Sequence, residues 1–129
     1  MLVVLGSKDH FLGNHIGRIL DKLELRKIRT VKIERIVREV KQPDKLLILD
    51  MNWKELQVAG ALRRLVNIAK ISGNKVVCIC PNEDDKLKKL AVAARPSEVF
   101  IRYDLELEFF AFLREVVREE LKKKEAEKK

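Results

Sequence analysis

The stretch Lys45-Leu46-Leu47-Ile48-Leu49-Asp50 decides the fold of this chain of 129 residues. Four consecutive aliphatic residues are typical of a strand that is covered on both faces, and such strands occur in parallel sheets. Asp50 then stands at the carboxyl end of the strand, which is the edge of an open parallel sheet where ligands bind. The stretch therefore predicts a central strand with an acidic residue at its functional end.

Short apolar runs and helix-like patterns alternate along the rest of the chain. Further strands are predicted over residues 2–5, 28–33, 76–80 and 99–103. Helices are predicted over residues 14–25, 33–40, 53–71, 87–94 and 105–121. This alternation is typical of βα units that form a parallel sheet with helices on both faces. We expect an α/β fold of (βα)5 type, a doubly wound and mostly parallel five-stranded sheet with the strand order 2-1-3-4-5.

Length and composition favour one domain over residues 1–121, followed by a charged tail over residues 122–129 that we expect to fray. No apolar run approaches the roughly 20 residues needed to cross a bilayer. The first residues lack the basic start and the small-residue cleavage site of a secretory signal, so we expect a cytoplasmic protein with no membrane contact. The share of charged residues is 37% and glutamine is scarce, a balance typical of thermophile proteins.

The order 2-1-3-4-5 places the ends of the first and third strands next to each other. It brings Asp9 close to Asp50, and two carboxylates are ligands that Mg²⁺ prefers, so this pair is a candidate magnesium site. Residues that follow other strand ends would complete a pocket at this switch point. With Asp9 they are Asn52, Cys80, Arg102 and Tyr103. Asp50 has a second interpretation, because an acid after a strand commonly caps the next helix.

The order of elements and the run Lys-Gln-Pro-Asp-Lys-Leu-Leu-Ile-Leu-Asp ending at Asp50 resemble the receiver domain of two-component response regulators. The resemblance covers roughly residues 1–118 and implies a flavodoxin-like fold. It also implies that Asp50 accepts a phosphoryl group from a histidine kinase, with Mg²⁺ held by an acidic pair after the first strand.

The chain departs from the receiver pattern at the residues around the acceptor. Ser7 and Lys8 stand near the places of the acidic pair, Cys80 or Pro81 replaces a hydroxyl residue, and Arg102 replaces a lysine. The Lys8 ammonium is a candidate to take the place of the cation. We therefore expect a degenerate receiver that binds a protein partner or a second copy, with phosphorylation of Asp50 left open and no required cofactor.

Residues 46–113 also resemble a STAS domain, the fold of anti-sigma factor antagonists. The resemblance rests on the Ile-Leu-Asp strand, on Gly60 before a long helix, and on the run Val-Phe-Ile-Arg-Tyr-Asp. That family carries a phosphorylatable serine just before the glycine, whereas Val58 and Ala59 stand there in this chain. A STAS domain also opens with a β-hairpin, and residues 14–25 read as a helix.

The net charge of +8 favours anionic partners and supports a second hypothesis, a small basic protein associated with nucleic acid. Its phosphate contacts would come from Arg26, Lys27, Arg29, Lys32, Arg35 and Arg38. Interspersed acids equally suit a solvated face of mixed charge. No GxGxxG or GxxxxGK[ST] loop follows the first strand, and no complete catalytic motif is present, so we do not expect an enzyme.

Overall fold

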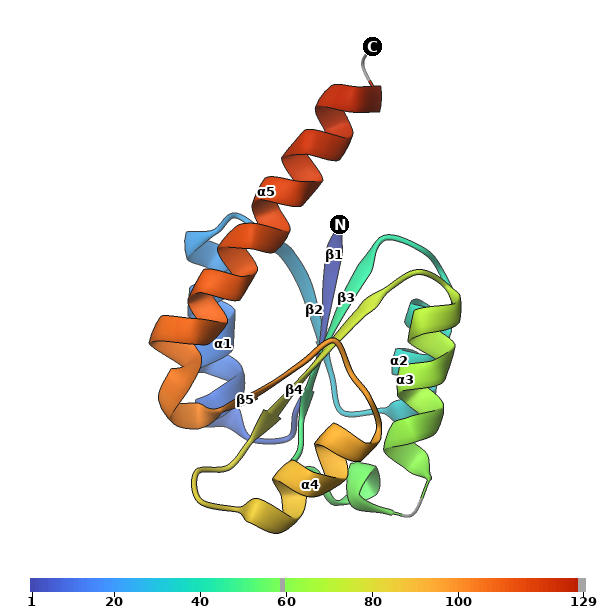
Figure 1. Cartoon of the computed structure of the whole chain (residues 1–129), viewed down its shortest axis with the longest axis vertical. Helices are drawn as coiled ribbons and strands as arrows, with labels where there is room; N and C mark the ends of the chain where they lie inside the picture. The colour runs from blue at the N-terminus through green and yellow to red at the C-terminus, as the bar shows by residue number, and fades with distance from the viewer. Residues whose placement is uncertain (59, 128–129) are drawn as a thin grey trace.

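The computed structural model describes residues 1–58 and 60–127, and its sheet confirms the predicted fold class (Figure 1). The strands are Leu2–Gly6 (β1), Arg26–Thr30 (β2), Lys45–Asp50 (β3), Lys75–Cys80 (β4) and Glu98–Ile101 (β5). They form one sheet in the order β2-β1-β3-β4-β5, and every neighbouring pair is parallel. The predicted order 2-1-3-4-5 is therefore confirmed.

Helices cover both faces of this sheet. They are His10–Lys22 (α1), Ile33–Val40 (α2), Ala61–Ile71 (α3), Asp85–Ala93 (α4) and Phe110–Glu127 (α5). Shorter turns are the 3-10 helices Lys54–Gln57 (η1) and Arg102–Asp104 (η2) and the π-helical segment Leu105–Phe109 (η3). Helices α1 and α5 lie on one side of the sheet, and α2, α3 and α4 lie on the other (Figure 1). No helix in the described ranges is long and apolar enough to cross a membrane.

The central strand β3 alternates its aliphatic side chains between two apolar layers. Leu47 and Leu49 pack in the layer beneath α2, α3 and α4, whereas Leu46 and Ile48 pack in the layer beneath α1 and α5. All four are fully buried. Burial of each such side chain stabilises the fold by about 1.5–3 kcal/mol, so the position of Asp50 at the strand end is firmly fixed.

Helix α1 begins at His10 and not at the predicted Asn14, because Asp9 caps it. The Asp9 carboxylate accepts a hydrogen bond from the Leu12 backbone N–H at 3.1 Å. Gly13 lies inside the helix although glycine is a poor helix former. The predicted strand over residues 28–33 was also misplaced, since β2 ends at Thr30, whose hydroxyl accepts the backbone N–H of Lys32.

The predicted helix over residues 53–71 is two helices, η1 and α3. Gly60 lies between them with a φ of +82°, a left-handed conformation that glycine adopts without a steric penalty. At the other end of the chain, α5 continues to Glu127 and does not stop at the predicted Leu121. Whether residues 122–129 fray is a question of motion, so this expectation stays a prediction. Residues 128–129 lie outside the described part of the chain.

Candidate functional site

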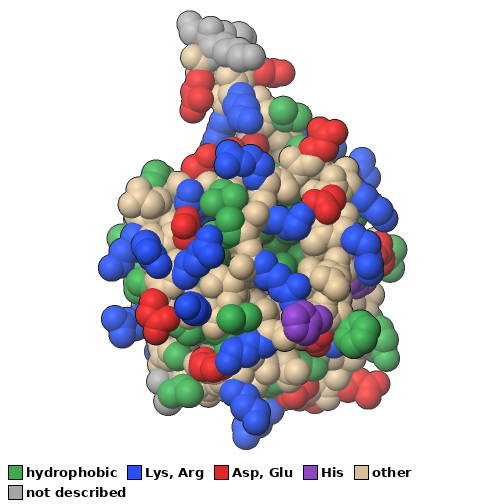
Figure 2. Space-filling view, turned by 180° about the vertical axis from the view of Figure 1, so that it is seen from behind, with side chains coloured by type: hydrophobic (Ala, Val, Ile, Leu, Met, Phe, Trp, Pro, Cys, Tyr) green, Lys and Arg blue, Asp and Glu red, His purple; other side chains and the backbone are tan. Residues whose placement is uncertain are grey.

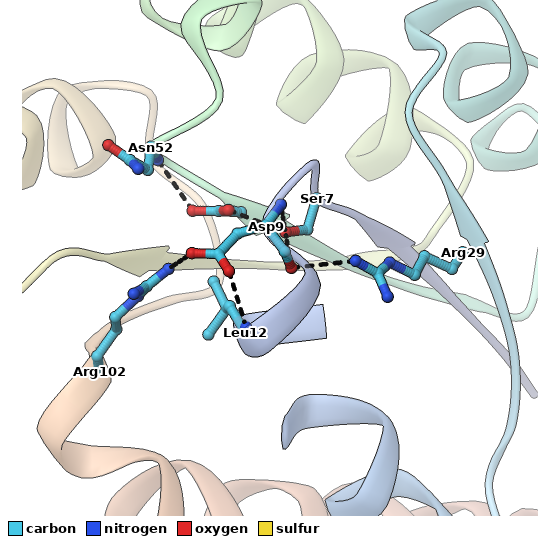
Figure 3. Close-up of polar contacts among 7 residues, drawn as sticks. Ser7, Asp9, Leu12, Arg29, Asn52 and Arg102 are labelled. Carbon is cyan, nitrogen blue, oxygen red and sulfur yellow. Dashed lines mark hydrogen bonds and ion pairs between the residues drawn. The ribbon is translucent and has the colours of Figure 1, made fainter. Parts of the chain in front are cut away.

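The carboxyl ends of β1 and β3 meet at a buried hydrogen bond. The Ser7 hydroxyl donates to Asp50 Oδ2 at 2.9 Å, and the backbone N–H of Asn52 donates to Asp50 Oδ1 at 2.9 Å (Figure 3). Ser7 is fully buried and Asp50 is 2% exposed. Each oxygen of the Asp50 carboxylate therefore already has a donor from the domain itself. The capping interpretation was wrong, because the next helix, η1, begins after Trp53 without a side-chain cap, and Asp50 accepts only the backbone N–H of Asn52 two residues further on.

Asp9 is held close to this bond but directs its carboxylate elsewhere. Its backbone N–H donates to Ser7 Oγ at 3.1 Å, so Ser7 lies between the two acidic residues. One carboxylate oxygen caps α1, and the other forms an ion pair with the guanidinium of Arg102 (Figure 3). The hydrogen bond from Arg102 is the main reason that the pKa of Asp9 is lowered from its ordinary value.

Arg29 contacts Asp9 from the opposite side. Its guanidinium donates to the Asp9 backbone carbonyl at 3.0 Å and to Asn14 Oδ1 at 3.3 Å. The sequence suggested Arg29 only as a phosphate contact. In the structure, two guanidinium groups from β2 and η2 position the turn that carries Asp9 (Figure 3).

The sequence suggested that the ammonium of Lys8 takes the place of a cation beside Asp50, but in the structure it is paired with Glu55. Its Nζ lies 2.6 Å from Glu55 Oε1 and 5.8 Å from the centroid of the Trp53 ring. The ring of Trp53 is buried, and its Nε1 has no hydrogen-bond partner in the described part of the chain. The acidic residue at the end of β1, Asp9, is therefore paired with Arg102 and not with Lys8.

The other predicted pocket residues are spread between the core and the surface. Cys80 is fully buried, and burial raises the pKa of its thiol to about 11. Tyr103 is 70% exposed, and its backbone N–H donates to Asn82 Oδ1 at 2.9 Å. Asn52 lies at the rim of a groove between η1 and α4. Of the five residues predicted to form one pocket, only Asp9 and Arg102 contact each other. Asn52, Cys80 and Tyr103 lie at separate places around them.

The predicted phosphate-binding residues divide between two elements. Arg26, Lys27 and Arg29 belong to β2, and Lys27 forms an ion pair with Asp21. The other three lie at the start of α2 or within it, and together with Arg29 they line a groove that also contains two glutamates. These three residues are Lys32, Arg35 and Arg38. On the face seen from behind, blue and red side chains are interspersed (Figure 2).

The sequence matches no known protein-family model, and no curated protein is significantly similar to it. Solved structures, in contrast, share its fold. A response regulator receiver protein from Burkholderia phymatum superposes with a TM-score of 0.69 at 19% identity, covering 90% of this chain and 94% of that one. The receiver domain of a sensor histidine kinase from Pseudomonas aeruginosa, with magnesium coordinated in its active site cleft, superposes with a TM-score of 0.66 at 12% identity. This match covers 92% of this chain and 94% of that one.

A third structure, a protein from Burkholderia pseudomallei described as pilus assembly-related, has a TM-score of 0.66 at 18% identity and covers 92% of this chain and 90% of that one. These likenesses show that the chain has the flavodoxin-like fold of receiver domains over most of its length. The STAS resemblance implied a β-hairpin at the start, where the structure has the parallel strands β1 and β2 joined by α1.

Proposed function

We propose that this chain is a receiver-like signalling domain that acts by binding a protein partner or a second copy, and neither as an enzyme nor as a phosphorylated switch. The observation that carries this proposal is the burial and hydrogen bonding of the Asp50 carboxylate. Asp50 is 2% exposed and takes hydrogen bonds from Ser7 and Asn52. A phosphoacceptor must present a carboxylate oxygen to an incoming phosphoryl group, whereas the carboxylate of Asp50 is buried and each of its oxygens accepts a hydrogen bond.

The residues around Asp50 also suit magnesium poorly. Mg²⁺ needs near-octahedral oxygen ligands and is usually bound through one or two carboxylates. Ser7 contributes only a hydroxyl beside Asp50, and the carboxylate of Asp9 is already paired with Arg102. No group of three or more His, Cys, Asp or Glu side chains that could hold a metal occurs among residues 1–58 and 60–127. The residues around Asp50 therefore do not fit a bound Mg²⁺ ion.

Exposed apolar side chains near the same end of the molecule support a partner-binding role. Phe11, Tyr103 and Leu107 are 88%, 70% and 71% exposed. They belong to α1, η2 and η3, and a contact between His15 and Glu106 at 2.5 Å joins α1 to η3. Large apolar and aromatic side chains are the residues that most often anchor a protein interface.

The test is an amide NMR titration of the full chain with Mg²⁺ and beryllofluoride, a mimic of the phosphoryl group, together with intact-mass measurement. A receiver domain that is known to be phosphorylated serves as the positive control. We expect the spectrum to stay unchanged. Shifts clustered around Asp9, Asp50 and Arg102 that vanish in the Asp50→Asn variant would contradict the proposal and establish a working phosphoacceptor.

A further inference from the structure

The two helical faces of the molecule differ in charge. Helices α2, α3 and α4 carry eight Lys and Arg residues and three acidic residues, a net charge of +5. The cationic residues are Arg35, Arg38, Arg63, Arg64, Lys70, Lys86, Lys88 and Lys89. Helices α1 and α5 carry seven cationic and six acidic residues, a net charge of +1. The excess positive charge of the helices therefore lies on one side of the sheet.

The cationic side chains of the α2–α3–α4 face are exposed and free of acidic partners. None of the eight lies within 4.0 Å of a carboxylate in the described ranges. On the opposite face, acids neutralise their neighbours, as in the pairs of Glu119 with Lys75 and of Glu115 with Arg118. Because the eight cations outnumber the three acids of the same helices, this face carries a positive potential.

Contacts between the helices make this face continuous. The guanidinium of Arg63 donates to the Ala93 carbonyl at 3.1 Å, and Lys70 donates to the Arg95 carbonyl, so α3 is tied to the end of α4. Helices α2 and α3 share the same apolar layer. Helices α2 and α3 pack against each other, and packed helices lie about 8–10 Å apart. A duplex carries one charge per about 1.7 Å of its axis, or on the order of five charges over that distance, and α4 extends the face beyond it.

We propose that the α2–α3–α4 face binds the phosphate backbone of double-stranded nucleic acid without reading its sequence. Single strands are bound through exposed aromatic side chains on which bases stack. The strongly exposed aromatic residues, Phe11 and Tyr103, belong to other elements, whereas α3 and α4 expose only the isolated aliphatic residues Ile71 and Val92. Contacts from Lys and Arg to phosphates position a protein on a duplex and carry no sequence information. The proposal does not depend on Asp50 or on the proposed function.

The decisive experiment measures binding of the full chain to a fluorescent DNA duplex of about 20 base pairs by anisotropy at several salt concentrations. Five to eight phosphate contacts predict a slope of log K against log salt between about −4 and −7. Affinity should then fall by roughly 250-fold to 16,000-fold between about 50 and 200 mM salt. Absence of salt-dependent binding would overturn the proposal.

A triple variant with one change on each helix, Arg38→Gln/Arg64→Gln/Lys89→Gln, tests the location of the site. None of these side chains makes a hydrogen bond or an ion pair in the described structure, so the fold should be retained. The slope should become shallower by about 2 to 3 and the affinity should fall at least about 30-fold. The matched control is Arg18→Gln/Arg114→Gln/Lys122→Gln on α1 and α5, which removes the same charge and should cost less than about threefold.

Equal losses in the two triple variants would mean that net charge alone drives binding, and would overturn the assignment to this face. Vesicles containing phosphatidylserine and the polymer poly-glutamate are tested under the same conditions. If the vesicles or poly-glutamate bind more tightly than the duplex, and only the α2–α3–α4 variant loses this binding, the duplex proposal is overturned. Tighter binding of vesicles would then assign the face to a membrane, and tighter binding of poly-glutamate would assign it to an acidic protein. Thermal unfolding checks both variants, and the single charge reversal Arg64→Glu repeats the test if the triple variant is unfolded.

Discussion

Single side chains set the chemistry at the carboxyl end of the sheet. Ser7 accepts a hydrogen bond from the Asp9 backbone and donates one to the Asp50 carboxylate, so one small hydroxyl joins the turn after β1 to the end of β3. A hydrogen bond to a charged acceptor contributes about 1.5–3 kcal/mol, and a buried carboxylate that loses it keeps the full desolvation cost. The same contact that stabilises the fold therefore keeps Asp50 turned inward.

The ion pair between Asp9 and Arg102 predicts a pH-dependent contribution to stability. The pKa of Asp9 is lowered below its ordinary value of 3.8, mainly by the hydrogen bond from Arg102. Since the folded-state pKa is the lower one, the contribution is complete above the ordinary pKa and is lost as the pH falls through the folded pKa. Replacing Arg102 by Gln should therefore lower the free energy of unfolding at neutral pH and have less effect in acid.

Urea unfolding of wild type and Arg102→Gln at pH 7 and in acid measures this difference. Because Asp9 and Arg102 are 25% and 33% exposed, solvent screening reduces the expected loss at pH 7 to about 1 kcal/mol. The variant Arg102→Lys keeps the charge and should recover part of it. A loss that is the same at both pH values would show that Arg102 acts through packing and not through Asp9.

At the scale of elements, β2 and α1 pack through an arginine that lies over a glycine. A Cβ at Gly13 would overlap the guanidinium of Arg29, so the space that glycine leaves is filled by that side chain. Arg29 also donates a hydrogen bond to the Asp9 carbonyl. This one side chain of the edge strand β2 therefore contacts both Gly13 in α1 and the turn that carries Asp9.

This arrangement predicts that the effect of Gly13→Ala depends on residue 29. Alanine stabilises a helix interior by about 1 kcal/mol over glycine, but at Gly13 it would displace Arg29 from Asp9. Gly13→Ala should therefore give little or no gain in wild type and a gain of about 1 kcal/mol in an Arg29→Ala background. Chemical denaturation of the four proteins in this double-mutant cycle measures the coupling, and equal effects in both backgrounds would contradict it.

The same elements show what local sequence patterns can predict. Strand β3 and the strand order followed from four adjacent aliphatic residues and from the alternation of helices and strands. The start of α1 was missed because Gly13 and Gly17 weaken the helical pattern, and only the contact with Arg29 explains Gly13. The break at Gly60 was missed because its cause is a backbone angle, which apolar spacing does not report.

The positions of three site residues were predictable because the fold alone determines them. Asp50 ends β3, and Asp9 and Arg102 follow the ends of β1 and β5, which the topology brings to one edge of the sheet. The partners of those side chains were not predictable, because Lys8 and Arg102 are both cationic and both near the end of a strand. Only the three-dimensional path of the chain turns Lys8 toward Glu55 and Arg102 toward Asp9.

For the whole molecule, the two cysteines report on cooperative unfolding. Cys78 and Cys80 are fully buried on β4, and burial raises the pKa of their thiols to about 12 and about 11. The thiolate is the reactive form, so the native state should not react with thiol reagents near neutral pH.

We therefore expect labelling of both thiols to occur only through opening of the domain. The free energy of opening from the labelling rate should equal the free energy of unfolding from urea denaturation, with both cysteines modified together. Mass spectrometry resolves the singly and doubly labelled proteins. Accumulation of a form labelled only at Cys80 would reveal local opening at the carboxyl end of β4, beside Asp50.

The position of β2 at the edge of the sheet has a consequence for self-association into fibres. An edge strand offers unpaired backbone groups to strands of other molecules, and lysine or arginine on that strand opposes such pairing because like charges repel. Arg26, Lys27 and Arg29 occupy three of the five residues of β2, and the other edge, β5, has only four residues. We therefore expect the cationic residues of β2 to oppose amyloid-like pairing of this edge with other molecules.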